Sequence, residues 1–284
     1  MDVAQEANDE QIALWNSAKG RVWVEAQAVL DQMFKPLEDL IVQAILAGPE
    51  SRVLDVGCGT GSTTLAVARR LGAQGQCIGI DVSEPMLTAA SGRAERHGVS
   101  ARFIRADAQT YAFEPASFDT IVSRLGVMFF DNPVGAFANL RRAAKDHAAL
   151  HFIAWRSAAD NAFMTTAERA AAPLLPNISL RRAGQPDAPG QFAFADQRRV
   201  HGILDESGWT EIDIRPVDLP CSFPETELVT CLTRLGPLGE ILHEADERTR
   251  SQVIETVRAA FDPYVQGREV RFTAACWLVE ARNA

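Results

Sequence analysis

Residues 52–61 have the sequence RVLDVGCGTG, a short apolar run that ends at three alternating glycines. The run is rich in β-branched residues, which favour a strand, and Leu65, Ala68 and Leu71 then recur at helical spacing. Glycines between a strand and a helix let the backbone turn tightly and approach a ligand closely. The N–H groups where the helix begins favour an anionic group. This stretch therefore predicts a strand, a ligand-binding turn and a helix.

Strands and helices continue to alternate after this first turn. Four further strands are expected at CIGIDV (77–82), ARFIRADA (101–108), FDTIVSR (118–124) and ALHFIAW (149–155). Ser83 is a natural N-cap for a helix that ends before Gly98, and another helix is expected from about Pro133 to Lys145. Repeated β-α-β units of this length predict a Rossmann-like α/β fold, with a mostly parallel sheet and helices on both faces.

The rest of the chain has a less regular pattern. Helices are expected at about 10–47, 161–175, 196–206 and 224–263, and late strands at TEIDIRPV (210–217) and RFTAACWLVEA (271–281). Residues 176–195 are rich in Pro, Gly and Gln, which is typical of a functional loop or a disordered segment. We interpret the chain as one domain, with a helical cap at about 1–47, a core at about 50–156 and 196–284, and helical insertions at about 160–195 and 224–263.

Two aspartates indicate which ligand the glycine turn is expected to bind. Asp81 ends the second expected strand, where a carboxylate can accept hydrogen bonds from both hydroxyls of a ribose. Asp55 lies two residues before Gly57, where it can serve an ammonium group but would repel a pyrophosphate. The spacing G-x-G-x-G also departs from the dinucleotide pattern G-x-G-x-x-G, because Ser62 stands at the position of its third glycine. The sequence favours a zwitterionic ligand over a dinucleotide.

Four segments resemble the class I S-adenosyl-L-methionine (SAM)-dependent methyltransferases, in the branch similar to the ubiquinone-biosynthesis C-methyltransferases: LDVGCGTG (54–61), GIDVSEPML (79–87), RADA (105–108) and FDTIVSRLGVMFF (118–130). The resemblance covers roughly residues 50–156. It implies a seven-stranded sheet with an antiparallel last strand, SAM as the cofactor and S-adenosyl-L-homocysteine as the product. The family often has a Pro-Gly-Gly turn before its fifth strand, where this chain has Lys145, Asp146 and His147. That departure puts the geometry of this loop in doubt rather than SAM binding.

The resemblance also assigns a set of cofactor-binding residues. The methionine part would lie along the first turn, the ribose at the end of the second strand, the adenine beside the third, and the methyl group at the end of the fourth. The residues implied, in that order, are Asp55, Gly57, Cys58, Gly59 and Gly61; Asp81; Val82, Met86, Asp107 and Ala108; Ser123 and Arg124. Structural alternatives stay open for Met86 as a core residue, for Asp107 as a strand-end cap and for Cys58 as a small buried filler.

The acceptor side is less well defined. Trp15 and Trp23 lie in the expected N-terminal cap, and Phe129 and Phe130 follow the fourth strand, so each is a candidate for an apolar acceptor pocket or for ordinary core packing. Arg124 could also pair with a carboxylate or phenolate of an acceptor. The residues that follow the fourth strand lack the Asn/Asp-Pro-Pro-aromatic motif of amino-methylating enzymes. No catalytic residue can be assigned, and a small organic acceptor is expected.

Composition limits the remaining classes of function and partner. The formal net charge is −9 and basic residues are scattered among acids, which argues against a nucleic-acid-binding protein. The five cysteines form no C-x-x-C pair and have no histidine at metal-ligand spacing, so no metal site is expected. No secretory leader and no membrane span are expected, and a reduced, cytoplasmic setting fits best. Both a monomer and a homodimer stay open.

The leading hypothesis is a SAM-dependent methyltransferase that transfers a methyl group to oxygen or carbon of a small molecule by in-line displacement. A methyltransferase-like protein that binds SAM for regulation, without turnover, is the first alternative. A nicotinamide-dependent oxidoreductase is the second, and selective binding of NADH over SAM would favour it.

Overall fold

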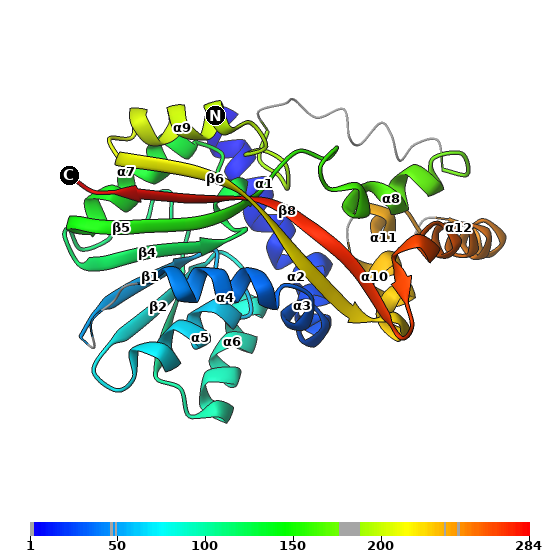
Figure 1. Cartoon of the computed structure of the whole chain (residues 1–284), viewed down its shortest axis with the longest axis horizontal. Helices are drawn as coiled ribbons and strands as arrows, with labels where there is room; N and C mark the ends of the chain where they lie inside the picture. Colours follow the sequence, from blue (N-terminus) through cyan, green and yellow to red (C-terminus); the bar gives the residue numbers. More distant parts are fainter. Residues whose placement is uncertain (1–2, 46–47, 49, 176–187, 236, 243–244) are drawn as a thin grey trace.

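A twisted β-sheet crosses the molecule from end to end (Figure 1). The computed structural model describes residues 3–45, 48, 50–175, 188–235, 237–242 and 245–284. The strand order is β3-β2-β1-β4-β5-β8-β6, with short β7 paired to β8. The strands are Arg52–Val56 (β1), Gln76–Asp81 (β2), Ala101–Arg105 (β3), Phe118–Arg124 (β4), Ala144–Trp155 (β5), Thr210–Pro224 (β6), Val265–Gln266 (β7) and Glu269–Arg282 (β8).

The pairing confirms the predicted mostly parallel sheet. Strands β1 to β5 are parallel to one another, whereas β8 runs antiparallel to β5 and to β6. The described part of the chain forms eight strands rather than seven, because the two-residue β7 pairs with the start of β8. All five parallel strands end at one edge of the sheet, so the turns that follow β1, β2 and β4 lie together.

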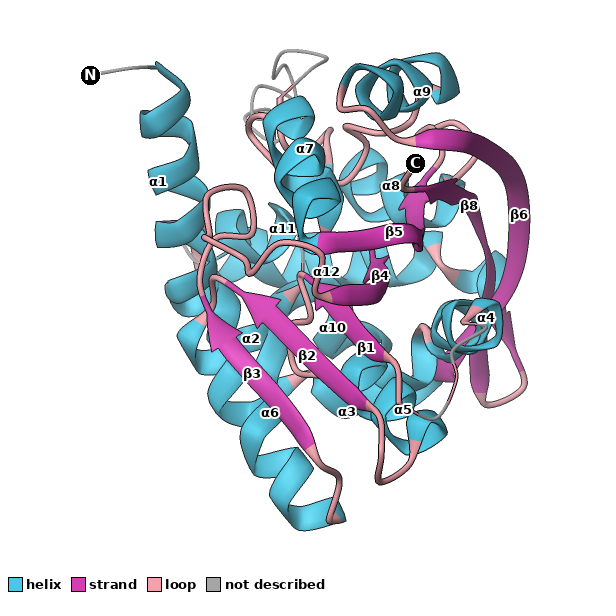
Figure 2. Ribbon diagram, turned by 90° about the vertical axis from the view of Figure 1, so that its left-hand side faces the viewer, coloured by secondary structure: helices cyan, strands magenta, loops and turns pink. Residues whose placement is uncertain are grey.

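Helices cover both faces of this sheet (Figure 2). Helix α5 contacts β1, β2 and β3, and α4 contacts β4, β5 and β6. Helix α6 contacts β3, α7 contacts β5 and α9 contacts β6. The helices are Val3–Asn16 (α1), Ala18–Glu25 (α2), Gln27–Met33 (α3), Lys35–Ala44 (α4), Ser62–Leu71 (α5), Glu84–His97 (α6), Pro133–Ala143 (α7), Ala162–Ala171 (α8), Gln197–Glu206 (α9), Leu228–Arg234 (α10), Pro237–Leu242 (α11) and Glu247–Ala260 (α12).

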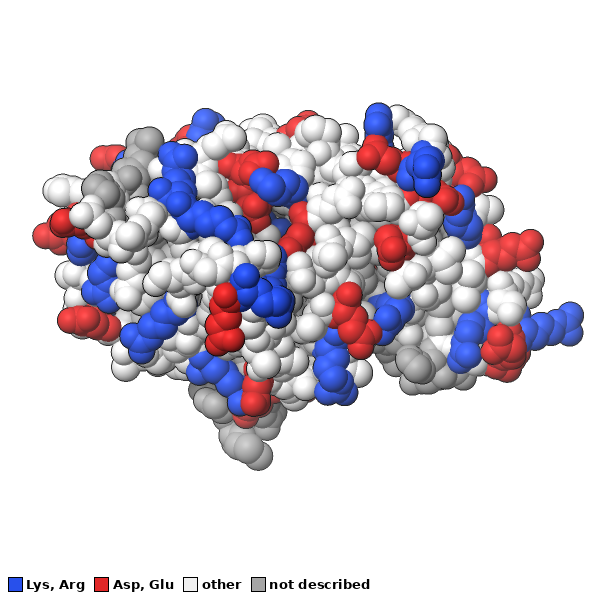
Figure 3. Space-filling model, turned by 90° about the horizontal axis from the view of Figure 1, so that it is seen from below, with Lys and Arg blue, Asp and Glu red and all other residues white. Residues whose placement is uncertain are grey.

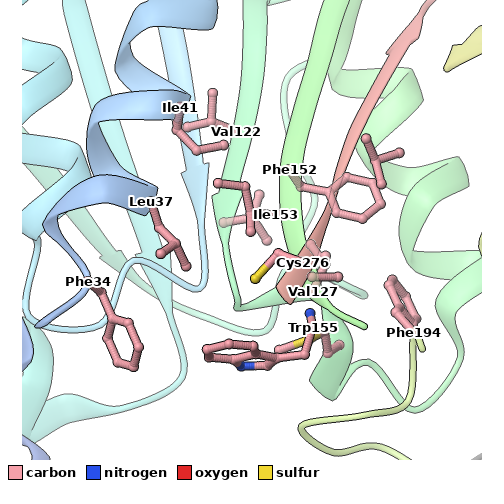
Figure 4. Packing of buried hydrophobic residues seen from close by; sticks show 14 of the residues in the cluster. Phe34, Leu37, Ile41, Val122, Val127, Phe152, Ile153, Trp155, Phe194 and Cys276 are labelled. Atoms are coloured by element: carbon pink, nitrogen blue, oxygen red, sulfur yellow. The ribbon is translucent and has the colours of Figure 1, made fainter. Parts of the chain in front are cut away.

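Side chains of β5 pack against helices on both faces of the sheet. Phe152 packs against Phe137 of α7, with ring centroids 5.5 Å apart. Trp155 lies on the opposite face of the strand, where its ring is 6.0 Å from that of Phe34, just before α4. Figure 4 shows Phe152 and Phe194 on one side of β5 and Phe34, Leu37 and Ile41 on the other. Strands buried on both faces explain why their sequences read as continuous apolar runs.

Strands β6 and β8 extend well beyond the rest of the sheet, and a group of helices packs at their far end (Figure 1). Helix α8 contacts α12, and α10 contacts both α11 and α12. Asn161 fixes this group to β8, because its side chain donates to the carbonyl of Ala275 at 2.9 Å and accepts from the N–H of Ala275 at 3.0 Å. These helices lie within the segments expected to be helical, at 161–175 and 224–263. Residues 176–187 of the expected loop lie outside the described residues.

One predicted helix end was wrong, and one predicted N-cap was confirmed, although its side chain bonds elsewhere. Helix α7 ends at Ala143 and β5 begins at Ala144, so Lys145 lies in a strand rather than in a helix. Ser83 is the N-cap residue of α6, but its hydroxyl makes no capping bond to that helix and donates instead to the carbonyl of Trp15 at 2.8 Å. The side chain at this cap is therefore used to hold the N-terminal helices.

The surface carries charges of both signs. On the face shown in Figure 3, Lys and Arg side chains alternate with Asp and Glu side chains. Several of them form ion pairs, such as that between Lys145 and Asp119 at 2.7 Å. Among the residues that the structure describes, none of the helices is both long enough and apolar enough to cross a bilayer.

Candidate functional site

The glycine turn after β1 has the backbone that only glycine adopts easily. Gly57, Gly59 and Gly61 have φ angles of +67°, +53° and +80°. A Cβ atom on Gly57 would lie 2.7 Å from Cα of Gly126, and one on Gly61 would lie 2.9 Å from Cβ of Ala90. Around Gly59 the nearest atom is Sδ of Met86, at 3.6 Å. Close packing therefore requires glycine at positions 57 and 61. Gly59 has no such close neighbour, so the lack of a side chain there leaves its backbone uncovered.

Asp81, the last residue of β2, braces this turn. One carboxylate oxygen accepts from the N–H of Gly59 at 2.8 Å, and the other accepts from the N–H of Ser83 at 2.9 Å. Burial raises the pKa of Asp81, while the hydrogen bonds from Ser83 and Gly59 act in the opposite direction. Each oxygen of a carboxylate can accept a second hydrogen bond. The residue that shapes the turn can therefore also bind a diol.

Asp55 lies beneath the same turn and is only 1% exposed. Its carboxylate accepts from the hydroxyl of Thr64 in α5 at 2.6 Å. Burial raises the pKa of Asp55 from 3.8 to about 7, opposed by the Thr64 hydrogen bond and by the charge of Arg124. Because this pKa lies close to neutral pH, a cation placed beside the carboxylate would stabilise its ionised form. The site thus contains an acidic group whose charge the protein itself only partly compensates.

Arg124 ends β4 and supplies a positive charge next to Asp55. Its Nε donates to the hydroxyl of Thr63 at 3.1 Å, in the first turn of α5. This bond is the one hydrogen bond that the described part of the chain gives its guanidinium. The remaining N–H groups can therefore bind an anion at the N-terminus of α5, where the helix dipole also favours one.

The turn after β4 is held by Ser123. Its hydroxyl donates to the carbonyl of Val56 at 2.8 Å and accepts from the N–H groups of Gly126 and Val127 at 3.2 and 3.3 Å. Leu125 within this turn has a φ of +65°, which is uncommon for a residue with a side chain. These bonds and the packing of Gly126 against Gly57 hold the ends of β1 and β4 against each other.

The other predicted site residues lie nearby with varied roles. Met86 is 4% exposed and Cys58 is 7% exposed, so both are buried. The carboxylate of Asp107 accepts from the N–H of Gln109 at 2.9 Å, and the carbonyl of Ala108 accepts from Asn139 at 2.9 Å, so this turn is well fixed. The structure brings all the predicted site residues to the carboxyl ends of β1, β2, β3 and β4, and whether each contacts a cofactor stays a prediction.

The N-terminal helices lie across these strand ends. Asn16 donates to the carbonyl of Val82 at 3.0 Å and accepts from the N–H of Glu84 at 2.9 Å. The ring of Trp15 makes edge contacts with Trp23 and Phe129, at centroid distances of 5.6 and 5.4 Å. These contacts hold the N-terminal helices against the residues that follow β2 and β4, and Phe129 belongs to the same aromatic group.

Several residues at the site were not identified from the sequence. Glu38 of α4 is 7% exposed and accepts a hydrogen bond from Ser62, the first residue of α5. Thr63 and Thr64 hold Arg124 and Asp55, and Gly126 presses on Gly57. Glu38 carries no sequence signal, because it lies in an ordinary amphipathic helix. Gly126 could have been identified, since a glycine directly after a strand often marks a close approach of two backbones.

Comparisons with known proteins point to one kind of domain. Residues 53–147 match the family described as "Methyltransferase domain". The chain is 31% identical over 100 residues to the nocamycin O-methyltransferase of Saccharothrix syringae, covering 35% of this chain and 36% of that protein. It is 25% identical over 164 residues to a ubiquinone/menaquinone biosynthesis C-methyltransferase of a Marinomonas species, covering 55% and 65%.

Among solved structures, the YcgJ protein of Bacillus subtilis has a similar fold. The TM-score is 0.57 at 18% identity, covering 86% of this chain and 97% of that one. The chain spans about half or less of the length of the first curated relatives that it matches. The segment that matches the family, residues 53–147, contains β2, β3, β4 and all of β1 except Arg52, and therefore the whole glycine turn with Asp81 and Arg124.

Proposed function

We propose, on the premise that this chain contains a class I SAM-dependent methyltransferase domain, that it transfers a methyl group from SAM to a small organic acceptor. The observation that carries this proposal is the arrangement of charges around the glycine turn. Asp81 and Asp55 lie at the ends of β2 and β1, and Arg124 lies at the end of β4 beside the N-terminus of α5. This arrangement suits a ligand that carries a ribose, an ammonium group and a carboxylate.

The residues present fit each part of SAM. Asp81 would accept hydrogen bonds from the ribose hydroxyls with the oxygen lone pairs that Gly59 and Ser83 leave free. Arg124 would hold the methionine carboxylate together with the N-terminus of α5. Asp55 would provide the compensating negative charge for the ammonium group. A pyrophosphate at the glycine turn would be repelled by the ionised carboxylate of Asp55, which weighs against a dinucleotide.

When bound, SAM supplies a methyl group that is already activated by attachment to a positively charged sulfur. The protein then needs mainly to position the acceptor and exclude water. The N-terminal helices and the turn after β4 provide the wall for this purpose, with Trp15 against Phe129 and with Leu125 half-buried at the end of β4. Well-oriented reactants can gain roughly 7–11 kcal/mol from positioning alone, so an acceptor that reacts already deprotonated, such as a phenolate or an enolate, needs no dedicated base.

The acceptor is proposed to be a small molecule methylated on oxygen or carbon. Two supports are the apolar character of the wall near β4 and the names of the two relatives, one an O-methyltransferase and one a C-methyltransferase. We place the enzyme in the cytoplasm, because its five cysteines are all free and buried, as expected in a reducing compartment. The single-domain organisation expected from the sequence belongs to the same proposal.

A turnover assay tests the function directly. Purified protein is incubated with SAM and a panel of phenols, carboxylic acids and enolisable ketones, and both S-adenosylhomocysteine and methylated product are measured by mass spectrometry. We expect equal amounts of the two with at least one acceptor class. Binding of SAM without product across the panel would favour the regulatory alternative, and selective binding of NADH would favour the oxidoreductase.

A further inference from the structure

Arg93 of α6 connects the glycine turn to the N-terminal helices. One terminal nitrogen donates to the carbonyl of Thr60 at 2.7 Å, and the other lies 2.5 Å from the carboxylate of Asp31 in α3. Gln27, one turn earlier in α3, also donates to Asp31. A single guanidinium therefore contacts both the turn proposed to bind SAM and the helices that lie across it.

This ion pair is more protected from water than most of the ion pairs that the structure describes. The side chain of Arg93 is 12% exposed and that of Asp31 is 23% exposed, whereas Arg271 and Glu269 are 56% and 39% exposed. Screening by water weakens exposed pairs much more than half-buried ones. Solvent therefore weakens the contact between Arg93 and Asp31 less than it weakens the more exposed pairs.

The peptide segment that Arg93 contacts is also held by Asp81. Asp81 accepts from the N–H of Gly59, while Arg93 donates to the carbonyl of the next residue, Thr60. Gly59 and Gly61 flank this carbonyl, and both have positive φ angles. Glycines have many accessible conformations, so two side chains are needed to select the one that presents the turn to a ligand.

We propose that Arg93 is a positioning residue that couples SAM binding to the docking of the N-terminal helices. Its bond to Thr60 fixes the turn in the binding conformation, and its bond to Asp31 makes that conformation depend on α3 being in place. By linkage, a ligand that favours the ordered turn also favours docked helices, to the same extent. This inference rests on the proposed function, since it takes SAM as the ligand of the turn.

The test uses four proteins: the unmodified chain, Arg93→Met, Asp31→Asn and the double variant. S-adenosylhomocysteine is titrated into each by calorimetry, and trypsin cleavage after Lys19 or Arg21 of α2 is followed with and without it. Arg271→Met is the matched control, because it removes an exposed ion pair distant in sequence from the turn. Melting of each unliganded variant checks that it is folded.

We expect Arg93→Met to weaken binding about tenfold or more, and Asp31→Asn to weaken it by a smaller factor. The double variant should resemble Arg93→Met alone, because Asp31 acts through Arg93. S-adenosylhomocysteine should slow cleavage in the unmodified chain several-fold and have little effect on cleavage in either single variant. Arg271→Met should behave as the unmodified chain in both assays.

The inference is overturned if folded Arg93→Met binds S-adenosylhomocysteine as tightly as the unmodified chain. It is also overturned if the ligand slows cleavage equally in the variants, or if the two substitutions have independent, additive effects on affinity. Failure of the unmodified chain to bind S-adenosylhomocysteine would contradict the proposed function itself, and that result is distinguishable because it does not depend on any variant.

Discussion

The ionised form of Asp55 is the form proposed to bind the ligand, whereas the protonated form makes the folded protein more stable. Asp55 is 1% exposed, and burial raises its pKa from 3.8 to about 7. The folded state therefore binds a proton that the unfolded chain releases between about pH 4 and pH 7. Stability from this group is fully present below about pH 4 and is lost as the pH rises to 7. The cost of ionising Asp55 in the unliganded protein is about 4 kcal/mol at pH 8, to order of magnitude.

Asp55→Asn should therefore stabilise the unliganded protein at pH 8. The amide oxygen can still accept from Thr64, and the buried charge is removed. We expect a gain of a few kcal/mol at pH 8 and a much smaller gain at pH 5, measured by urea denaturation at both pH values. Affinity for S-adenosylhomocysteine should fall at least tenfold. An Asn variant that is less stable at pH 8 would contradict the account.

The affinity of the unmodified protein should depend on pH in a defined direction. An ammonium group beside Asp55 favours the ionised carboxylate, so binding should release a proton where Asp55 is partly protonated. We expect the affinity for S-adenosylhomocysteine to rise between pH 6 and pH 8 and to be nearly independent of pH in that range for Asp55→Asn. Calorimetry in buffers of different ionisation enthalpy measures the proton release directly.

Arg124 can be tested against another arginine of the same sheet. Arg124→Met should weaken S-adenosylhomocysteine binding about tenfold or more, because a charge-assisted bond to the carboxylate is lost. Arg102→Met is the control, since Arg102 is exposed on the edge strand β3. The same titrations with 5′-methylthioadenosine, which lacks the methionine carboxylate, should show little difference between Arg124→Met and the unmodified chain. A loss of affinity equal for both ligands would contradict the assignment.

Glycines with positive φ angles have different roles in two elements, the turn after β1 and the end of α6. Gly57 and Gly98 both have positive φ angles, of +67° and +60°. A Cβ on Gly57 would meet Gly126 at 2.7 Å, whereas nothing lies within 4 Å of a Cβ on Gly98, which ends α6. Only the first position therefore combines a backbone requirement with a packing requirement.

Gly57→Ala and Gly98→Ala form a matched pair that separates the backbone requirement from the packing requirement. Each should cost about 1 kcal/mol for its left-handed backbone. Gly57→Ala should cost further stability because β1 and β4 must separate, and it should abolish measurable binding of S-adenosylhomocysteine. Gly98→Ala should leave binding unchanged. Thermal melting and calorimetry of both variants provide the measurements, and equal loss of binding in the two would contradict the packing argument.

Most elements of the sheet could be predicted from the sequence, because buried parallel strands leave uninterrupted apolar runs between helical patterns. The structure confirms strands at each of the seven expected positions. Their lengths were harder to predict: β6 continues to Pro224, because its prolines stand on an edge strand, where a missing N–H is tolerated. The end of α7 at Ala143 was also missed, since no glycine or proline separates it from β5.

The contacts between distant segments could not be predicted from local patterns. Arg93 and Asn16 contact the turns that follow β1 and β2, and Glu38 contacts the first residue of α5, although all three lie in unremarkable helical sequences. Periodicity indicates which face of a helix is buried but not which turn its polar residues reach. The motifs therefore located the candidate site, and the tertiary structure was needed to show how the N-terminal helices complete it.

The burial of all five cysteines makes unfolding of the molecule measurable with a thiol reagent. Burial raises the pKa of each thiol, to about 12 for Cys221 and about 11 for Cys231, so native thiolate is scarce. We expect the native protein to react slowly with an aromatic disulfide and the urea-unfolded protein to react at all five positions. Rapid labelling of one thiol in the native state would show local opening that the packing does not predict.

The central claim is that Asp81 and the glycine turn form the cofactor site. Its most direct test is calorimetric titration with S-adenosylhomocysteine of the unmodified protein, of Asp81→Ala and of Asp119→Ala. Asp119 is the matched control, because it accepts from the N–H of Arg52 at 2.9 Å and lies at the start of β4 rather than at its carboxyl end. We predict micromolar binding that weakens at least tenfold in Asp81→Ala and is unchanged in Asp119→Ala. Absence of binding in the unmodified protein, or equal binding in all three, would contradict it.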